Sequence, residues 1–376
     1  EEIPAGVRTY NLKAISEFNN FFAGGFLAHN KGGGCLYTYS VSGEEMTLDH
    51  LAYPFSIIPS WEEYSYGAME HLAPEDGLLK VRLSEELPEI TNINHVRLFA
   101  VDHPDGSQVM PDGYGRIHTL SDPQAPLLCV ARDGSDCRAT VSDEDDDSYL
   151  FDLIAVDRED LPDAQDGIII EFPNPSSAKM VKLVIRGEES GLITFVWWNV
   201  LDRVGRNNMQ DFLTRLDSNP LESLFFEQFA NNRGKVTIQV WDSGKWMDLG
   251  SEYLGFSKHG KGGDVLMTLS PPPGDDNLKI RLIFSKGAFS IDYVRVDYSE
   301  DEPMILYELP MVSAEASDSS DSLTLLESDD DLYLTFSKGG WVDVAFSEPA
   351  VDNDLQRSYT IAVKGHYTYD IRTERV

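Results

Sequence analysis

The stretch "NLKIRLIFSKGAFSIDYVRVDY" (residues 277–298) decides the fold, because two β-type ladders follow one another in it. Apolar residues recur at every second position of "LKIRL" and again along "FSIDYVRV", which is the period of a β-strand. In the second ladder both faces carry apolar residues, as a central strand of a packed sheet would. Similar ladders run through the rest of the chain and alternate with Gly, Pro, Asn and Asp, so the sequence predicts a mainly β protein.

The same two ladders occur earlier in the chain. "LLKVRL" (residues 78–83) and "NHVRLFAVDH" (residues 94–103) precede their counterparts by about 200 residues. A second pair of segments agrees: "CVARDGSDCRATVSDEDDDSYLFDL" (residues 129–153) is echoed by "VSAEASDSSDSLTLLESDDDLYLTF" (residues 312–336). Repetition of two different units in the same order indicates a tandem duplication of the form A, B, A′, B′.

We therefore expect tandem jelly-roll-like β-sandwich modules with a short helical insert between the two halves. The expected boundaries are β-sandwich A at 1–122, a small β unit B at 123–204, a helical bridge at 205–232, β-sandwich A′ at 233–305 and a small β unit B′ at 306–376. In the bridge, "DSNP" (residues 217–220) supplies cap residues between two short amphipathic helices. The apolar stripes of these helices are expected to pack into the core.

"LKIRLIFSKGAFSIDYVRV" (residues 278–296) resembles the last two core strands of the galactose-binding-like jelly roll, a β-sandwich shared by many carbohydrate-binding modules and discoidin-type domains. The resemblance implies ligand binding through loops at the rim of the sandwich or on a concave face. No ligand motif of that family is matched, so no site residue is carried over. "LLKVRL", "NHVRLFAVDH" and "GRIHTLSDP" also resemble a C-terminal region of large uncharacterised bacterial proteins, which implies no activity.

The chain is strongly acidic. Asp and Glu number 64 against 30 Lys and Arg, which gives a net charge of −34. Such a field repels nucleic-acid backbones and anionic lipid, so we expect neither nucleic acid nor a membrane surface as a partner. The longest apolar stretch, Leu192 to Leu201, is about half as long as a membrane-spanning helix, so we expect no membrane insertion.

The beginning of the chain, "EEIPAGVRTY", has neither Met nor a basic and apolar leader, which indicates a mature or trimmed end. This is compatible with secretion, and we expect an extracellular or cell-surface location. Cys129 and Cys137 bracket an Asp-Gly turn and face each other across an expected hairpin. They form either a disulfide or two reduced, half-buried thiols.

The acidic turns of units B and B′ are candidate metal sites. Carboxylates crowded in a turn repel one another, and a Ca²⁺ ion with its many oxygen ligands would relieve that repulsion. The spacing is not that of an EF-hand loop, and charge runs in turns are often simply solvated. The candidate ligands are Asp143, Asp145 and Asp147 in B, with Asp329 and Asp331 in B′.

Two aromatic segments are candidate ligand-binding surfaces. "SIIPSWEEYSYGAMEH" (residues 56–71) combines rings with carboxylates, a mixture that holds sugars by stacking and hydrogen bonding. The second segment flanks "DSGK" in an expected hairpin. The alternative for both is ordinary core or cross-strand packing. The candidate residues are Trp61, Glu62, Tyr64 and Tyr66 in the first segment, and Trp241 and Trp246 in the second.

No catalytic motif is present: G-x-S-x-G, H-E-x-x-H, C-x-x-C and a phosphate loop are all missing. His103, Asp105, Asp112 and His118 form either a metal site or a polar turn. We expect a non-catalytic extracellular protein for binding or surface assembly, with a glycan or a protein surface as partner. The alternatives are a carbohydrate-active hydrolase with paired carboxylates and a calcium-stabilised adhesion segment. Exposed edge strands would allow a homo-oligomer or filament.

Overall fold

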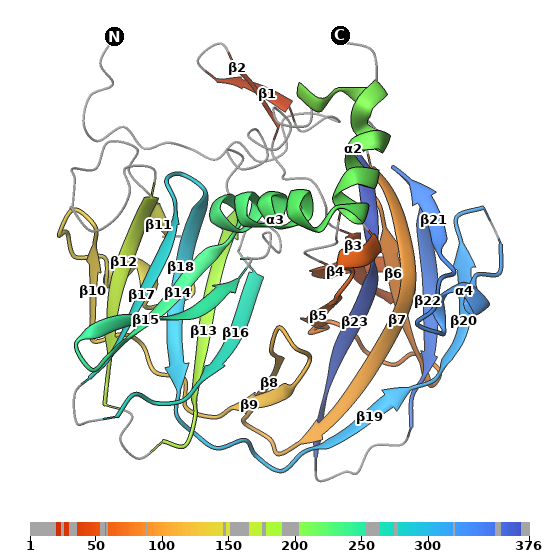
Figure 1. Cartoon of the computed structure of the whole chain (residues 1–376). Helices are drawn as coiled ribbons and strands as arrows, with labels where there is room; N and C mark the ends of the chain where they lie inside the picture. Colours follow the sequence, from red (N-terminus) through yellow and green to blue (C-terminus); the bar gives the residue numbers. More distant parts are fainter. Residues whose placement is uncertain are drawn as a thin grey trace.

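The fold is mainly β, as expected, and was obtained as a computed structural model. The structure describes residues 20–23, 26–29, 36–52, 57, 59–86, 89–145, 148–150, 165–174, 178–189, 203–252, 254, 263–273, 277–318, 320–349 and 355–369. Two β-sandwiches lie side by side (Figure 1). We call them the central sandwich, built from strands within residues 128–297, and the terminal sandwich, built from residues 36–103 together with 305–369.

The central sandwich consists of two antiparallel sheets. Its five-stranded sheet has the order β10-β12-β17-β14-β15, and its four-stranded sheet has the order β11-β18-β13-β16. We call the second of these the β18 sheet. The strands are β10 (Leu128–Ala131), β11 (Tyr149–Leu150), β12 (Gln165–Phe172), β13 (Val181–Glu189), β14 (Val236–Asp242), β15 (Lys245–Glu252), β16 (Gly263–Leu269), β17 (Leu278–Ser285) and β18 (Phe289–Asp297).

The terminal sandwich also consists of two sheets. One has the order β20-β22-β6-β3-β4, and the other has the order β19-β7-β23-β5 with β21 also paired to β7. We call the second one the β7 sheet. The strands are β3 (Leu36–Ser42), β4 (Glu45–Ala52), β5 (Tyr64–Ala68), β6 (Leu78–Ser84), β7 (Glu89–His103), β19 (Ile305–Leu309), β20 (Met311–Ala316), β21 (Leu334–Ser337), β22 (Trp341–Ser347) and β23 (Gln356–Tyr369).

The two sandwiches have the same topology. The order β10-β12-β17-β14-β15 corresponds strand for strand to β20-β22-β6-β3-β4, and β11-β18-β13-β16 corresponds to β21-β7-β23-β5. The register agrees as well, because Tyr149 lies opposite Ile291 in one sandwich and Leu334 lies opposite Ile93 in the other. An irregularity interrupts β13 after Arg186 and β23 at the matching place. The duplication seen in the sequence is thus present in three dimensions.

The pairing corrects the predicted division of the chain. Unit A combines with B′ and unit B combines with A′, so residues 1–122 and 233–305 are not sandwiches on their own. The physical reason is that the early ladders β6 and β7 take their neighbours from the C-terminal unit, β22 and β23. Without these strands, backbone groups at the sheet edges and the apolar inner faces would be left uncovered.

Each sandwich has its own core. In the terminal sandwich, alternate residues of β6 are fully buried: Leu79, Val81 and Leu83. Their counterparts in β17 are Leu278, Ile280 and Leu282, which are buried in the core of the central sandwich. Burying one such side chain stabilises the fold by about 1.5–3 kcal/mol, so the alternation holds each ladder in its register.

A short hairpin and a polar network join the sandwiches. The hairpin of β8 (Gln108–Pro111) and β9 (Ile117–Leu120) packs against both β5 and the β18 sheet. Close to it, the fully buried Lys182 donates to Asp301 at 3.0 Å, and the Nδ1 atom of His118 lies 2.9 Å from the same carboxylate. A buried ammonium needs such a partner. The chain crosses between the sandwiches in residues 104–127 and 298–304, and these contacts hold the two crossing segments together.

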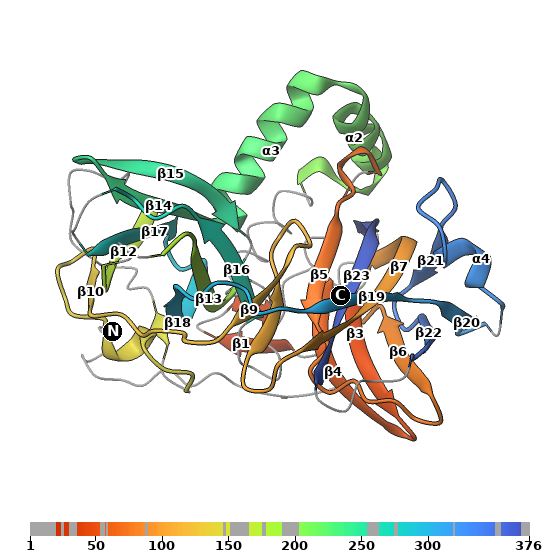
Figure 2. The ribbon, with the colours of Figure 1, turned by 90° about the horizontal axis from the view of Figure 1, so that it is seen from below.

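Two helices occupy the predicted bridge. The helices α2 (Arg206–Ser218) and α3 (Pro220–Gly234) meet at Asn219, whose side chain accepts hydrogen bonds from the backbone N–H groups of Leu221 and Glu222. Figure 2 shows both helices on the same side of the molecule. The apolar stripe of α2 is buried, as expected. The same expectation for α3 was wrong, because its residues Leu221, Leu224 and Phe225 are exposed.

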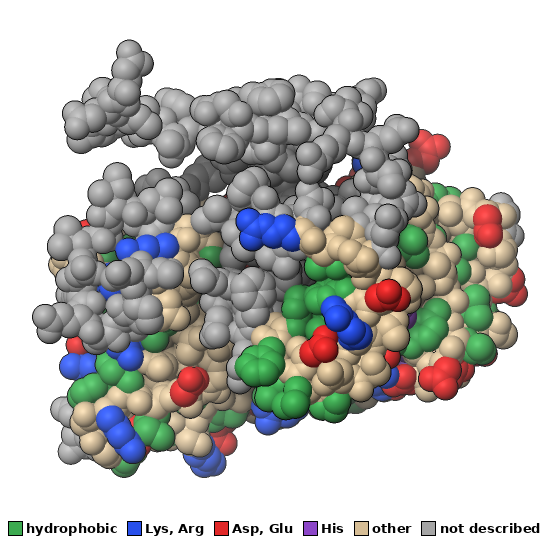
Figure 3. All heavy atoms as spheres, turned by 45° about the horizontal axis from the view of Figure 1, so that its top comes forward, with side chains coloured by type: hydrophobic (Ala, Val, Ile, Leu, Met, Phe, Trp, Pro, Cys, Tyr) green, Lys and Arg blue, Asp and Glu red, His purple; other side chains and the backbone are tan. Residues whose placement is uncertain are grey.

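The remaining described elements are short. They are the hairpin of β1 (Asn20–Ala23) and β2 (Phe26–His29), the 3-10 turns η1 (Pro59–Trp61) and η2 (Ala139–Val141), and α4 (Leu323–Leu326). None of the described helices has the length and apolarity needed to cross a bilayer. On the face drawn in Figure 3, acidic and basic side chains are interspersed over the described surface.

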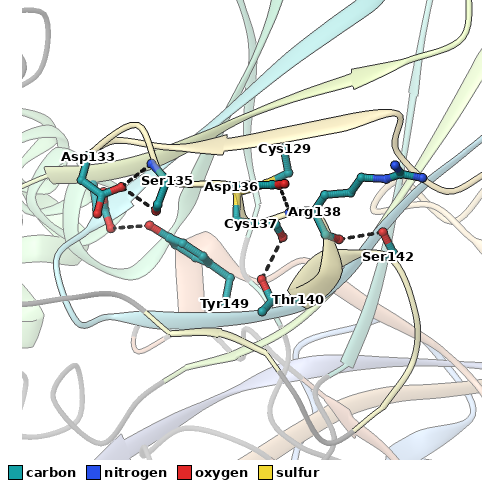
Figure 4. The surroundings of a disulfide bond; sticks show 10 residues. Cys129, Asp133, Ser135, Asp136, Cys137, Arg138, Thr140, Ser142 and Tyr149 are labelled. Atoms are coloured by element: carbon teal, nitrogen blue, oxygen red, sulfur yellow. Dashed lines mark hydrogen bonds between the residues drawn. A yellow bond between two sulfur atoms is a disulfide. The ribbon is translucent and has the colours of Figure 1, made fainter. Parts of the chain in front are cut away.

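Cys129 and Cys137 form a disulfide bond in the central sandwich (Figure 4). Both residues are buried, and the backbone N–H of Cys137 donates to the carbonyl oxygen of Cys129 at 3.0 Å. The disulfide therefore closes the turn between β10 and η2, and of the two alternatives that the sequence left open the bonded one is observed.

Candidate functional site

The outer face of the β7 sheet brings together four of the residues that the sequence singled out, Glu62, Tyr64, Tyr66 and Asp329. Because side chains alternate along β7, Val96 and Leu98 point into the core while His95 and Arg97 point outward. Strands β5 and β23 add their own outward residues beside them. We call this set the Tyr64 cluster; its members are Glu62, Tyr64, Tyr66, His95, Arg97, Glu308, Asp329, Tyr333, Lys364 and His366.

Tyr64 stands at the centre of a chain of hydrogen bonds. Its hydroxyl lies 2.7 Å from the Nδ1 atom of His95 and donates to Asp329 at 3.1 Å. Asp329 also accepts from the ammonium of Lys364 at 2.6 Å. Since the hydroxyl proton goes to Asp329, the Nδ1 atom of His95 would donate to the Tyr64 oxygen, which leaves the Nε2 lone pair of His95 directed away from this chain.

The charges of this chain follow from its geometry. Burial and the charge of Asp329 raise the pKa of Tyr64, so its hydroxyl stays protonated. Burial and the nearby Arg97 lower the pKa of His95, which favours a neutral imidazole. The hydrogen bond from Lys364 lowers the pKa of Asp329 and keeps that carboxylate ionised. At neutral pH the cluster thus offers hydroxyl, imidazole and carboxylate groups in fixed orientations.

A second polar pair lies beside the first. Glu62 is almost fully buried, and its carboxylate contacts the Nδ1 atom of His366 and accepts from the Tyr333 hydroxyl at 3.4 Å. Among the described residues, no side chain or backbone group is hydrogen-bonded to the Nε2 atom of His366. Glu62 therefore fixes the orientation of an imidazole whose second nitrogen can meet a ligand.

Aromatic rings line the same face. The rings of Tyr64 and Tyr66 lie 5.9 Å apart, and both side chains are half-buried. Arg97 stacks over the Phe99 ring at 4.7 Å and forms a two-pronged hydrogen bond with Glu308 at 2.8 and 2.6 Å. Such a pair holds the guanidinium in place, so the cluster is preorganised rather than loosely solvated.

The central sandwich carries a matching but covered cluster. There Glu144 pairs with Arg186, as Asp329 pairs with Lys364, and Tyr293 takes the place of His95. Tyr293 is 7% exposed and packs with Met110 of the β8–β9 hairpin. Within the described residues, the face of the terminal sandwich carries the partly exposed side chains of Tyr64, Tyr66, His95 and His366.

Of the first predicted segment, Glu62, Tyr64 and Tyr66 come together in the Tyr64 cluster, but Trp61 does not. Its ring stacks on that of Phe226 in α3, with the ring centroids 6.2 Å apart, so Trp61 packs against the helices. Its position at η1, before β5 begins, explains the difference.

The second predicted segment forms a separate surface on the central sandwich. Trp241 and Trp246 are direct cross-strand neighbours in the β14–β15 hairpin, with their rings 5.2 Å apart. The guanidinium of Arg281 covers the Trp246 ring at 4.6 Å, and Trp241 is 39% exposed. One ring of the pair is therefore accessible, while the other is engaged within the sheet.

Two of the predicted metal ligands in the acidic turns, Asp143 and Asp329, are paired with cations. Asp143 lies 3.7 Å from Arg295, Asp329 binds Lys364, and the backbone N–H of Asp145 approaches Asp292 at 3.5 Å. Asp331 adds a negative charge near Tyr333, and Asp147 lies outside the described residues. Within the described ranges, no three His, Cys, Asp or Glu side chains are grouped so as to hold a metal ion.

The residues of the other candidate metal site are distributed differently. His118 lies 3.5 Å from Asp112, but its Nδ1 atom is engaged by Asp301. His103 instead contacts Ser107 and Ser358. Asp112 accepts from the backbone of its own turn and pairs with Arg116 at 2.7 Å, which agrees with the polar-turn interpretation.

Sequence reasoning missed His95, Arg97, Lys364 and His366. All four stand at outward positions of strands, and the outward positions of "HVRL" and "VKGH" were the available signal. That signal gains meaning only when β7 and β23 are known to be neighbours, because these strands are more than 250 residues apart in the chain.

Comparison with known proteins finds only distant similarities. The sequence matches no protein-family model and no curated protein. Among solved structures, allantoicase is similar with a TM-score of 0.23 and 10% identity, covering 62% of this chain and 81% of that one. A structure described as the triple jelly roll fold and turret assembly in an archaeal virus has a TM-score of 0.16 and 8% identity, covering 90% of this chain and 91% of that one. At TM-scores this low the similarities carry no argument, and the β-sandwich fold is shown by the sheet topology of the chain itself.

Proposed function

We propose that the protein is a non-catalytic binding protein of the extracellular space or cell surface, and that it binds a glycan at the Tyr64 cluster. The proposal rests on one observation: the Tyr64 and Tyr66 rings share an accessible sheet face with oriented hydroxyl, imidazole, ammonium and carboxylate groups. Sugars are bound by just this combination of flat rings and polar groups. A protein surface is the alternative ligand.

The internal comparison supports this assignment. Positions that the fold requires are alike in both sandwiches, such as the acidic residue paired with the basic residue of β13 or β23. His95 and His366 have no imidazole at the matching positions, where Tyr293 and Glu188 stand. The topology that the two sandwiches share therefore does not require imidazoles at these positions, and both imidazoles lie on the outer face of the β7 sheet.

The finer fold assignment belongs to the same proposal. We assign both sandwiches to the galactose-binding-like jelly rolls because of the "LKIRL" and "IDYVRV" ladders. The extracellular location is supported by the disulfide between Cys129 and Cys137, since such bonds persist in oxidising compartments.

The hydrolase alternative is less well supported. A general acid needs a carboxyl group of raised pKa, whereas the pKa values of Asp329 and Glu308 in the cluster are lowered by Lys364 and Arg97. Burial raises the pKa of Asp166, Glu252 and Asp292, but these residues are not members of the cluster.

The test is a glycan array probed with the full chain, followed by calorimetric titration of each hit. We expect Tyr66→Ala to weaken binding about tenfold, the loss of one stacking contact, and Trp241→Ala to leave it unchanged. A glycan whose binding depends on Trp241 and not on Tyr66 would move the site to the β14–β15 hairpin. An array without hits above background would remove the glycan and leave a protein partner.

A further inference from the structure

The two halves of the chain complete each other's sandwiches. The first half, residues 1–202, contains units A and B, and the second half, residues 203–376, contains the helices with A′ and B′. Each sandwich takes one unit from each half. The halves therefore meet along several antiparallel strand pairs in each sandwich, and we call each of these pairs a seam.

In the terminal sandwich two of the seams are β6 with β22 and β7 with β23, and the others are β5 with β23 and β7 with β19 and β21. Arg82 faces Asp343 across the first seam and binds its carboxylate at 2.6 and 2.7 Å. Across the second seam, Arg357 binds Asp102 at 2.5 and 2.7 Å, and both side chains are buried. The apolar core under these seams draws on both halves.

The central sandwich repeats this arrangement with the halves exchanged. Its seams are β12 with β17, β13 with β18, β11 with β18 and β13 with β16, where β11, β12 and β13 come from the first half. Lys179 pairs with Glu300 at 2.7 Å, and Lys279 pairs with Glu171 at 3.1 Å. The core of this sandwich is also built from both halves.

Contacts outside the sheets add to the seams. Lys182 of the first half is buried against Asp301 of the second, and Trp61 of the first half stacks on Phe226 of the second. Buried apolar area, strand pairing and a satisfied buried charge are the features of an obligate protein interface rather than of two domains that touch in passing.

We propose that the two halves are reciprocal binding partners, so that the complex of residues 1–202 with residues 203–376 is the folded unit and the covalent link between Asp202 and Arg203 is dispensable. Each half is an incomplete pair of sandwiches on its own, and the partner that fits its open sheet edges is the other half of this chain.

The test uses the full chain with a protease site placed between Asp202 and Arg203 and cut after folding. The expected product shows two bands in denaturing electrophoresis, elutes at the volume of the intact protein in native buffer and melts within a few degrees of it. Two separate folded species of about half the mass would overturn the proposal, because that result requires A with B and A′ with B′. Precipitation upon cutting would overturn it too, since the link would then be needed.

Charge reversal at one seam tests its contribution. In the cut protein, Arg82→Asp places like charges opposite Asp343 and is expected to weaken association of the halves roughly tenfold. Adding Asp343→Arg should restore it. The matched control is Arg215→Asp, because Arg215 pairs with Glu222 inside the second half. Equal weakening by the seam variant and the control, or failure of the double variant to restore association, would contradict the assigned seam.

Discussion

Asp292 and Asn94 take the same position in the two sandwiches but carry different side chains. The Asn94 amide accepts from the backbone N–H of Asp330 at 3.2 Å and donates to the carbonyl oxygen of the same residue, so it is fully engaged. Asp292 receives only the backbone N–H of Asp145, and its second carboxylate oxygen is buried without a hydrogen-bond partner among the described residues. The acidic turn is therefore fully hydrogen-bonded to Asn94 in the terminal sandwich and only partly hydrogen-bonded to Asp292 in the central sandwich.

Asp292→Asn should stabilise the protein at neutral pH. Burial, followed by the charges of Asp145 and Glu144, raises the pKa of Asp292 above its unfolded value. The protonated form is then favoured in the folded state, so stability falls as the pH rises from the unfolded pKa, near about 4, through the folded pKa. An Asn side chain at position 292 does not ionise, so the variant does not lose stability as the pH rises. We expect a gain near zero below that range and about 1 kcal/mol at neutral pH, measured by urea unfolding.

The control for this variant is Asp143→Asn, which changes an exposed carboxylate of the same turn. A gain of equal size in the control, or a gain at Asp292 that does not grow with pH, would contradict the assignment.

Ala314 and Ser322 stand where the central sandwich has its disulfide. The N–H of Ser322 donates to the carbonyl oxygen of Ala314 at 2.9 Å, as Cys137 does to Cys129 at 3.0 Å, and the Ser322 hydroxyl is buried without a partner among the described residues. Ala314→Cys with Ser322→Cys should therefore form a second disulfide that adds about 2 kcal/mol of stability and loses it on reduction. Thiol counting and thermal melting with and without reductant check this; two free thiols in the oxidised double variant would contradict it.

At the scale of elements, the β8–β9 hairpin supports the proposed site. Gly115 in its turn has φ +78°, and a Cβ atom there would lie 2.3 Å from the Tyr66 ring. The glycine thus permits both the turn and the close approach to the ring. The hairpin packs on the matching face of the central sandwich and also lies against Tyr66, while Tyr64, His95 and Lys364 of the Tyr64 cluster stay partly exposed.

Gly115→Ala should displace Tyr66 and weaken the proposed glycan binding as well as stability. Gly106→Ala is the matched control, because Gly106 has φ +88° and open space around its Cα. Both changes cost about 1 kcal/mol of backbone strain, and Gly115→Ala costs a further 1–3 kcal/mol for the clash. Thermal melting and glycan titration measure the difference. Equal effects of the two variants would show that Tyr66 is not held by this contact.

At the scale of the whole molecule, the strand ladders and the duplication could be predicted from the sequence, because alternation and repeated order are local properties. The helical bridge was also readable, from the cap at Asn219. The partner of each unit could not be predicted from the sequence. Arg82 faces Asp343, and its counterpart Arg281 faces Ile169, yet either ladder would accept either partner on apolar pattern alone. The candidate site was only half visible for the same reason, since His95 and Lys364 become neighbours only through that pairing.

The central claim is that unit A pairs with B′ and not with B. Cys35, the third cysteine of the chain, is first replaced by Ser so that it cannot react. In this background the variant Arg82→Cys with Asp343→Cys places two thiols at directly paired positions of β6 and β22. The comparison variant, Arg82→Cys with Ile169→Cys, uses the equivalent position of β12, which lies opposite Arg281. Non-reducing electrophoresis after mild oxidation measures the cross-link. We expect a cross-link in the first variant alone; a cross-link between positions 82 and 169 without one between 82 and 343 would contradict the pairing of A with B′.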